Sequence, residues 1–148
     1  MTKIIGFFQL SGDEDVGDLF TPYVWGENCF TKFINPIIKS ANYGIDLKLI
    51  LIQYYVEGKF DLNAPDKPKL SNYSSKKKDI AVTIHVTRDK FHDVSDSKRR
   101  QFIVETTLQA IDMVEKRLSK RKLDINFDAL RKDIQKAAKE YLKSAGEK

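Results

Sequence analysis

The segment Ile45–Phe60 constrains the fold most strongly, because it is apolar on both faces of an extended chain. Its alternate positions form two apolar sets, Leu47, Leu49 and Leu51 on one face and Ile50, Ile52, Tyr54 and Val56 on the other. A strand with two apolar faces is stable when other parts of the protein pack against both faces, as they do for a central strand of a sheet. We therefore predict a central strand over Ile45–Phe60.

Two other segments have the composition and alternation of strands. Lys3–Leu10 is a short apolar segment that ends at a turn-forming Ser-Gly-Asp sequence. Asp79–Thr87 alternates strictly between aliphatic residues on one face and Ala, Thr and His residues on the other, which predicts a half-buried strand. Asp61–Lys78 holds two prolines, several serines and three consecutive lysines, so we expect a connection between strands there.

The C-terminal third is helical by periodicity. A first amphipathic helix should begin at a cap supplied by Ser95 or Asp96 and run to about Arg121. A second should begin at Asp124 or Asn126 and end at Gly146. Nearer the N-terminus, Asn28 is placed to cap a short helix that Pro36 would kink, and an extended segment fits the same residues.

Length and composition limit the architecture to one domain. The chain has 148 residues, of which 41% are hydrophobic, and we expect residues 1–148 to form a single core. No apolar run approaches the roughly 20 residues that cross a bilayer, and no secretory signal is recognised at the N-terminus. We predict an α+β fold, a small, mainly antiparallel sheet with two C-terminal amphipathic helices packed on one face, and no membrane partner.

The charges are divided along the chain. From Met1 to Asp66 there are five lysines against nine Asp and Glu residues, whereas the remainder is strongly basic, and the net charge is +5. Such a division allows two oppositely charged faces, each with its own partner.

An acidic segment near the N-terminus is the most suggestive candidate site. It contains the carboxylates and the tryptophan that we predict to bind a partner: Asp13, Glu14, Asp15, Asp18, Trp25 and Glu27. Carboxylates crowded in this way repel one another unless they are solvated or face cations, and an aromatic anchor among charges is typical of protein interfaces. The alternative is a solvated turn whose Trp25 fills the core.

Residues that could carry catalysis or hold a metal are few. Cys29, His85 and His92 are the soft ligands available, fewer than a zinc site with its usual spacing requires. Neither GxxxxGK[ST] nor GxGxxG occurs, so no nucleotide cofactor is predicted. A Cys-His nucleophilic pair is left open, but burial as a structural residue suits Cys29 better. A single cysteine also favours the reducing cytoplasm.

The basic runs leave a nucleic-acid-binding module as the alternative function. They are Lys76 to Lys78, Lys98 to Arg100, Lys116 with Arg117, and Lys120 to Lys122. The last run lies at the end of a predicted helix, where cations offset the macrodipole, and pairs such as Asp112 with Lys116, Asp128 with Lys132 and Lys136 with Glu140 have the spacing of helix ion pairs. Aromatic residues are not interleaved with these runs, as base stacking requires. Nucleic acid is therefore a less favoured partner.

The second half of the chain resembles the small immunity proteins of bacterial polymorphic-toxin and contact-dependent growth inhibition systems. The residues that carry the resemblance are Lys78–Val86, Phe102–Asp112 and Phe127–Ile134, with Trp25 and the Glu57-Gly58-Lys59 sequence as lesser support. The resemblance implies a cytoplasmic protein without enzymatic activity that binds a cognate toxin domain, often a nuclease, and holds it inactive. It identifies no interface residue.

Overall fold

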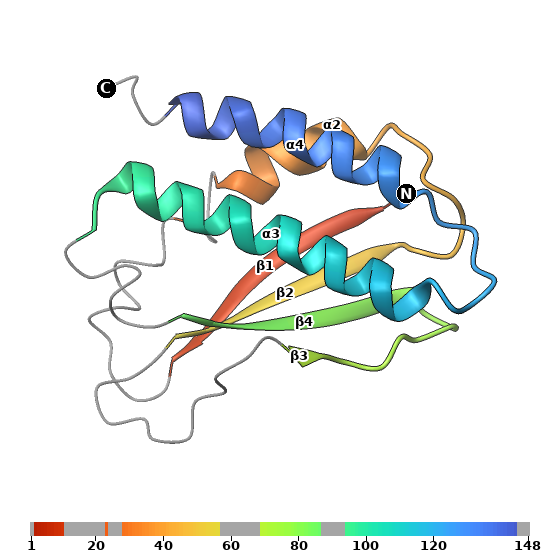
Figure 1. Cartoon of the computed structure of the whole chain (residues 1–148). Helices are drawn as coiled ribbons and strands as arrows, with labels where there is room; N and C mark the ends of the chain where they lie inside the picture. The colour runs from red at the N-terminus through yellow and green to blue at the C-terminus, as the bar shows by residue number, and fades with distance from the viewer. Residues whose placement is uncertain (1, 11–22, 24–27, 57–68, 87–93, 145–148) are drawn as a thin grey trace.

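The computed structural model describes residues 2–10, 23, 28–56, 69–86 and 94–144 (Figure 1). Its strands are β1 (Lys3–Leu10), β2 (Leu49–Val56), β3 (Lys69–Leu70) and β4 (Asp79–Val86). Its helices are the π-helix η1 (Cys29–Ile34), α2 (Asn35–Ile38), α3 (Asp96–Leu118) and α4 (Phe127–Ser144). The α+β class is therefore confirmed.

The sheet has the order β1-β2-β4-β3, and the predicted orientation of its strands is wrong. β2 lies at the centre, as predicted, but it pairs in parallel with both β1 and β4, and only the short β3 runs antiparallel. Parallel neighbours need a long crossover instead of a hairpin, and the connections 11–48 and 57–78 provide one each. The C-terminal ends of β1, β2 and β4, at Leu10, Val56 and Val86, therefore lie next to one another at the same end of the sheet.

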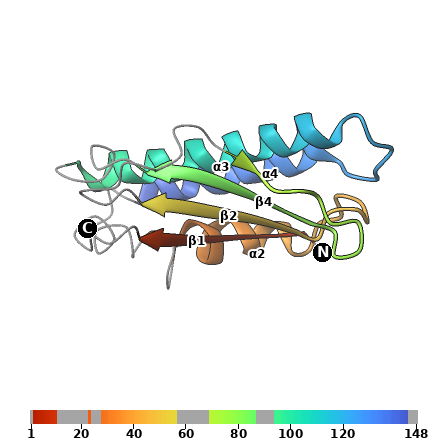
Figure 2. The same ribbon diagram turned by 90° about the horizontal axis from the view of Figure 1, so that it is seen from below.

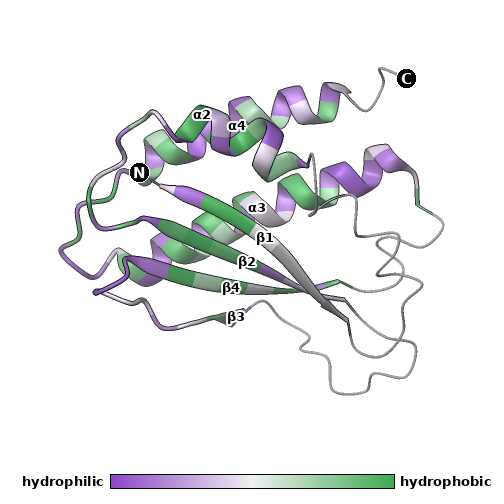
Figure 3. Ribbon diagram, turned by 180° about the vertical axis from the view of Figure 1, so that it is seen from behind, coloured by the Kyte–Doolittle hydropathy of each residue, from purple (hydrophilic) through white to green (hydrophobic). Residues whose placement is uncertain are grey.

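All described helices cover the same face of the sheet, which Figures 2 and 3 show from two sides. The core lies between the two layers and receives alternate residues of each strand, including Ile4, Ile52 and Val82. The alternation predicted for β4 is confirmed, because its residues are half-buried and buried in turn. Within the core, the hydroxyl groups of Tyr54 and Thr106 are hydrogen-bonded at 2.9 Å.

Side-chain caps set where the helices begin. The Asn28 side chain accepts hydrogen bonds from the backbone amides of Phe30 and Thr31, so the predicted cap of a short helix is confirmed, and the helix that it caps is a π-helix. Ser95 caps α3 through the amide of Lys98, and the side chain of Asn126 accepts from the amide of Ala129 at the start of α4. α3 ends at Leu118, short of the predicted Arg121.

The outer edge of β1 is closed by a side chain. The backbone amide of Ile4 donates to Oδ1 of Asn35 at 3.0 Å, and Nδ2 of Asn35 donates to the carbonyl oxygen of Ile4 at 2.7 Å. This primary amide thus makes the two bonds that a neighbouring strand would make, and it fixes α2 against the sheet.

Candidate partner-binding surface

The predicted acidic site falls outside the residues that the structure describes. It consists of Asp13, Glu14, Asp15, Asp18, Trp25 and Glu27. Their role remains a prediction. In the described part of the chain, the basic residues provide the most distinctive surface.

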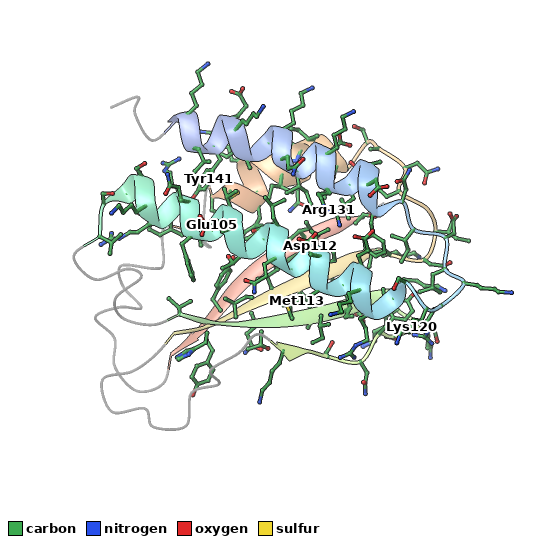
Figure 4. The ribbon with its side chains drawn as sticks, in the orientation of Figure 1. Glu105, Asp112, Met113, Lys120, Arg131 and Tyr141 are labelled. Carbon is green, nitrogen blue, oxygen red and sulfur yellow. The ribbon has the colours of Figure 1, made fainter. Side chains whose placement is uncertain are left out.

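A basic groove runs between α3 and β3. Its lining residues, which define the name, are Leu70 of β3 and Met113, Lys116, Arg117 and Lys120 of α3 and its end, and its volume is about 500 Å³. Figure 4 shows Met113 on α3 above the sheet and Lys120 next to the C-terminal end of this helix. Positions 113, 116 and 117 are spaced as neighbours on one face of α3, and Lys120 follows in the turn just after the helix. The helix face and the turn together place the three cations beside Leu70 and Met113.

A second hollow, of about 270 Å³, continues from the basic groove because Arg117 lines both. Its other lining residues include Tyr73 and Arg121. The Arg121 guanidinium lies 5.2 Å from the centre of the Tyr73 ring, a cation–π contact that fixes the cation next to the groove.

Asp46 anchors this end of the molecule. Its carboxylate accepts from the backbone amide of Asp124 at 2.6 Å and pairs with Nζ of Lys78 at 3.0 Å, while its backbone carbonyl accepts from the Tyr73 hydroxyl. These bonds to the Asp124 amide and the Lys78 ammonium hold the pKa of the Asp46 carboxyl below its usual value. Through Tyr73, the same residue positions Arg121.

Three carboxylates of α3 and α4 are engaged by a single arginine of α4. Arg131 bonds to Asp112 at 3.0 Å, to Asp128 at 3.2 Å and to Glu115, joining the two helices. The expected pair of Asp112 with Lys116 is therefore wrong, and so is that of Asp128 with its neighbour four positions on. Among the described residues, no carboxylate pairs with the groove cations Lys116, Arg117 or Lys120.

The cations at the start of α3 have structural roles. Arg100 donates to Asp96 at 2.9 Å, to the Tyr141 carbonyl at 2.9 Å and to the Ser144 hydroxyl at 2.6 Å, and it stacks over the Tyr141 ring. This arginine fastens the start of α3 to the end of α4. The run from Lys98 to Arg100 is one of the four basic runs behind the nucleic-acid alternative, and its support is weakened because Arg100 is used within the fold.

The candidate nucleophile is inaccessible. Cys29 is fully buried, and burial raises the pKa of its thiol to about 12, which leaves almost no thiolate at neutral pH. The structural interpretation of Cys29 is confirmed. His85 lies on the sheet face opposite the helices, with its ring centre 6.4 Å from that of Tyr55 and with no hydrogen-bond partner for Nε2 within the described residues.

The described residues contain neither a metal-ligand cluster nor a membrane-spanning helix. In residues 2–10, 23, 28–56, 69–86 and 94–144, no three His, Cys, Asp or Glu residues are grouped as metal ligands would be. Within the same ranges, no helix combines the length and apolar composition needed to span a bilayer.

Comparison with known families decides what kind of protein this is. A family model described as Immunity protein 44 matches residues 7–140, which is most of the chain. The chain belongs to the immunity protein 44 family. No curated protein and no solved structure matches it. Membership in this immunity family indicates toxin neutralisation in general, a toxin as partner, and a mode of action that is generally non-catalytic.

Sequence reasoning identified the cations of the groove in this immunity protein but missed the groove itself. The spacing of Met113 with Lys116, Arg117 and Lys120 was visible in the sequence as one helix face. The opposite wall of the groove could not be predicted. Leu70 belongs to a two-residue strand, and the sequence around it predicts only a connection between strands. Tyr73 was missed for the same reason.

Proposed function

We propose that this immunity protein binds a cognate toxin domain in the cytoplasm and blocks its active site by covering it, without a catalytic step. The observation that carries the proposal is the match to the immunity family over residues 7–140. The buried, protonated Cys29 supports it, since the most nucleophilic side chain of the chain is withheld from any substrate.

The proposed contact with the toxin's active site is the acidic segment, Asp13, Glu14, Asp15, Asp18, Trp25 and Glu27. A toxin that acts on nucleic acid, such as a nuclease, has a basic active site, and a group of carboxylates around an aromatic anchor is complementary to it. Opposite charges on the two partners would also speed their association.

Co-expression tests the function directly. The toxin domain encoded by the adjacent upstream gene is expressed in bacteria with or without this chain, and growth and co-purification are measured. Restored growth together with a purified complex is expected. Loss of both, with the chain folded by circular dichroism, would refute the proposal.

The acidic contact is tested by a variant that keeps side-chain size. Replacing Asp13, Asp15 and Asp18 by Asn and Glu14 by Gln should slow association with the toxin by about tenfold at low ionic strength and flatten its salt dependence. A control variant, Glu105→Gln with Glu140→Gln, removes exposed carboxylates from α3 and α4 and should associate like the wild type. Association rates by surface plasmon resonance that are equal in all three proteins would exclude the acidic segment as a contact.

A further inference from the structure

We propose that the basic groove binds an acidic segment of the toxin domain and takes one of its apolar side chains between Leu70 and Met113. This inference rests on the proposed function and adds a second contact, of opposite charge to the acidic segment. It stands on the lining of the groove and on the finding that no carboxylate of the described residues pairs with its cations.

The lining of the groove combines two chemistries. Leu70 and Met113 are half-buried and form an apolar floor, while Lys116, Arg117 and Lys120 are exposed above it. A methionine has an unbranched and adaptable side chain, which suits a pocket that must close around another side chain. An apolar floor with a cationic rim is complementary to a segment that carries one apolar residue among carboxylates.

Helix electrostatics account for only part of this charge. The cations in the last turn of α3, Lys116 and Arg117, are stabilised by the macrodipole. Lys120 and Arg121 follow just beyond the helix, so the four like charges also repel one another. The dipole gives no reason for the apolar second wall at Leu70 or for the lack of carboxylates among the described lining residues. An acidic segment with one apolar side chain is complementary to both features.

The hollow between α3 and α4 differs from the basic groove because a carboxylate is among its lining residues. It is larger, about 640 Å³, and it is also rimmed by lysines, Lys132, Lys136 and Lys139. Its lining includes the carboxylate of Asp133, which accepts a hydrogen bond from Tyr43. This hollow therefore contains its own counter-charge, and its lysines provide a matched control.

The groove suits a protein better than a nucleic acid. Base recognition needs an open aromatic face, but the ring of Tyr73 carries the guanidinium of Arg121, and its hydroxyl is bonded to Asp46. The floor beside it is aliphatic and thioether, with no ring on which a base would stack. A protein segment is the occupant to which these contacts point.

Charge reversal tests the cationic rim. Lys116→Glu with Arg117→Glu and Lys120→Glu is compared with Lys132→Glu, Lys136→Glu and Lys139→Glu, using surface plasmon resonance against the toxin domain from the adjacent upstream gene. The groove variant should lose about 100-fold in affinity, with association slowed at low ionic strength, and the control should stay within about threefold. Equal losses in both variants, or no loss in the groove variant, would overturn the proposal.

A second pair of variants tests the apolar floor. Met113→Ala should speed dissociation about fivefold to tenfold without changing association, whereas Leu108→Ala, a half-buried residue of the α3–α4 hollow, should change neither. Unchanged dissociation of Met113→Ala would remove the apolar contact from the proposal.

Two outcomes separate this inference from the proposed function. A wild-type chain that neither binds nor protects against the toxin refutes the function, and the groove proposal falls with it. A groove variant that binds and protects normally refutes the groove alone. Retention of a duplex oligonucleotide by the wild type, lost in the groove variant while toxin binding persists, would assign the groove to nucleic acid and overturn the proposal.

Discussion

Asp46 shows how one carboxylate can organise a surface. It joins the segment before β2 to the connection after α3 through Asp124, to the turn before β4 through Lys78, and to Tyr73. Because Tyr73 in turn holds Arg121, the arrangement of the second hollow depends on this residue. The effect of a substitution can therefore be predicted for both stability and pH dependence.

Asp46→Asn should lower stability at neutral pH, by an amount that disappears in acid. The folded-state pKa of Asp46 lies below the usual value of 3.8, so its contribution is present above the unfolded pKa and is lost as the pH falls through the folded pKa. Urea denaturation at pH 7 and near pH 3 measures this difference. Stabilities of variant and wild type that differ equally at both pH values would contradict the assignment.

At the residue scale, the sequence predicts which strand and helix faces are buried, but it does not predict which residues form ion pairs with one another. The alternation of Ile80, Val82 and Ile84 confirms that a period of two fixes which side chains enter the core. The choice of Arg131 over Lys116 as the partner of Asp112 depends on how α3 and α4 pack together. Spacing along one helix contains no such information.

At the scale of elements, the amide of Asn35 connects a helix to a strand edge. Its two hydrogen bonds with Ile4 satisfy backbone groups that β2 cannot reach. Edge strands are otherwise open to pairing with other chains. This side chain therefore contributes both to stability and to keeping the edge closed.

Asn35→Ala should destabilise the chain by about 1–3 kcal/mol, because it leaves the amide and carbonyl of Ile4 without these partners. Chemical denaturation monitored by circular dichroism measures the change. Asn72→Ala removes an exposed amide from the second hollow and should stay within about 0.5 kcal/mol of the wild type. If the denaturation midpoints of Asn35→Ala and Asn72→Ala are equal, water replaces the two hydrogen bonds between Asn35 and Ile4 without loss of stability.

The order and direction of the elements were less predictable than their positions. β1 and the cap of α3 agree with the sequence prediction, since composition and capping are local properties. The direction of β2 relative to its neighbours is a tertiary choice, and β3 has two residues, too few for a periodic signal. The basic groove could be predicted only in part. Its α3 wall follows from helical periodicity, but its other wall is the short strand β3, whose position beside α3 is a tertiary property.

At the scale of the whole molecule, long-range contacts connect the described elements into one core. Arg100 joins the two ends of the α3–α4 pair, and Tyr43 donates a hydrogen bond to Asp133 of α4. The buried residues of strands and helices form one cluster. We therefore expect these elements to unfold as a single cooperative unit.

We predict one unfolding transition for residues 1–148, as expected for a single domain. The calorimetric enthalpy should equal the van't Hoff enthalpy in differential scanning calorimetry. Circular dichroism and tyrosine fluorescence should give the same midpoint. Two resolved transitions, or a ratio of calorimetric to van't Hoff enthalpy well above one, would show that the helices and the sheet unfold separately.

The parallel register of β1, β2 and β4 has a consequence for the end of the sheet at which they finish. Leu10 is paired with Val56 and Val56 with Val86, so the three strands stop side by side. A molecule that contacts this end of the sheet therefore meets three adjacent strand ends with the same polarity, where an antiparallel sheet would alternate strand starts and ends.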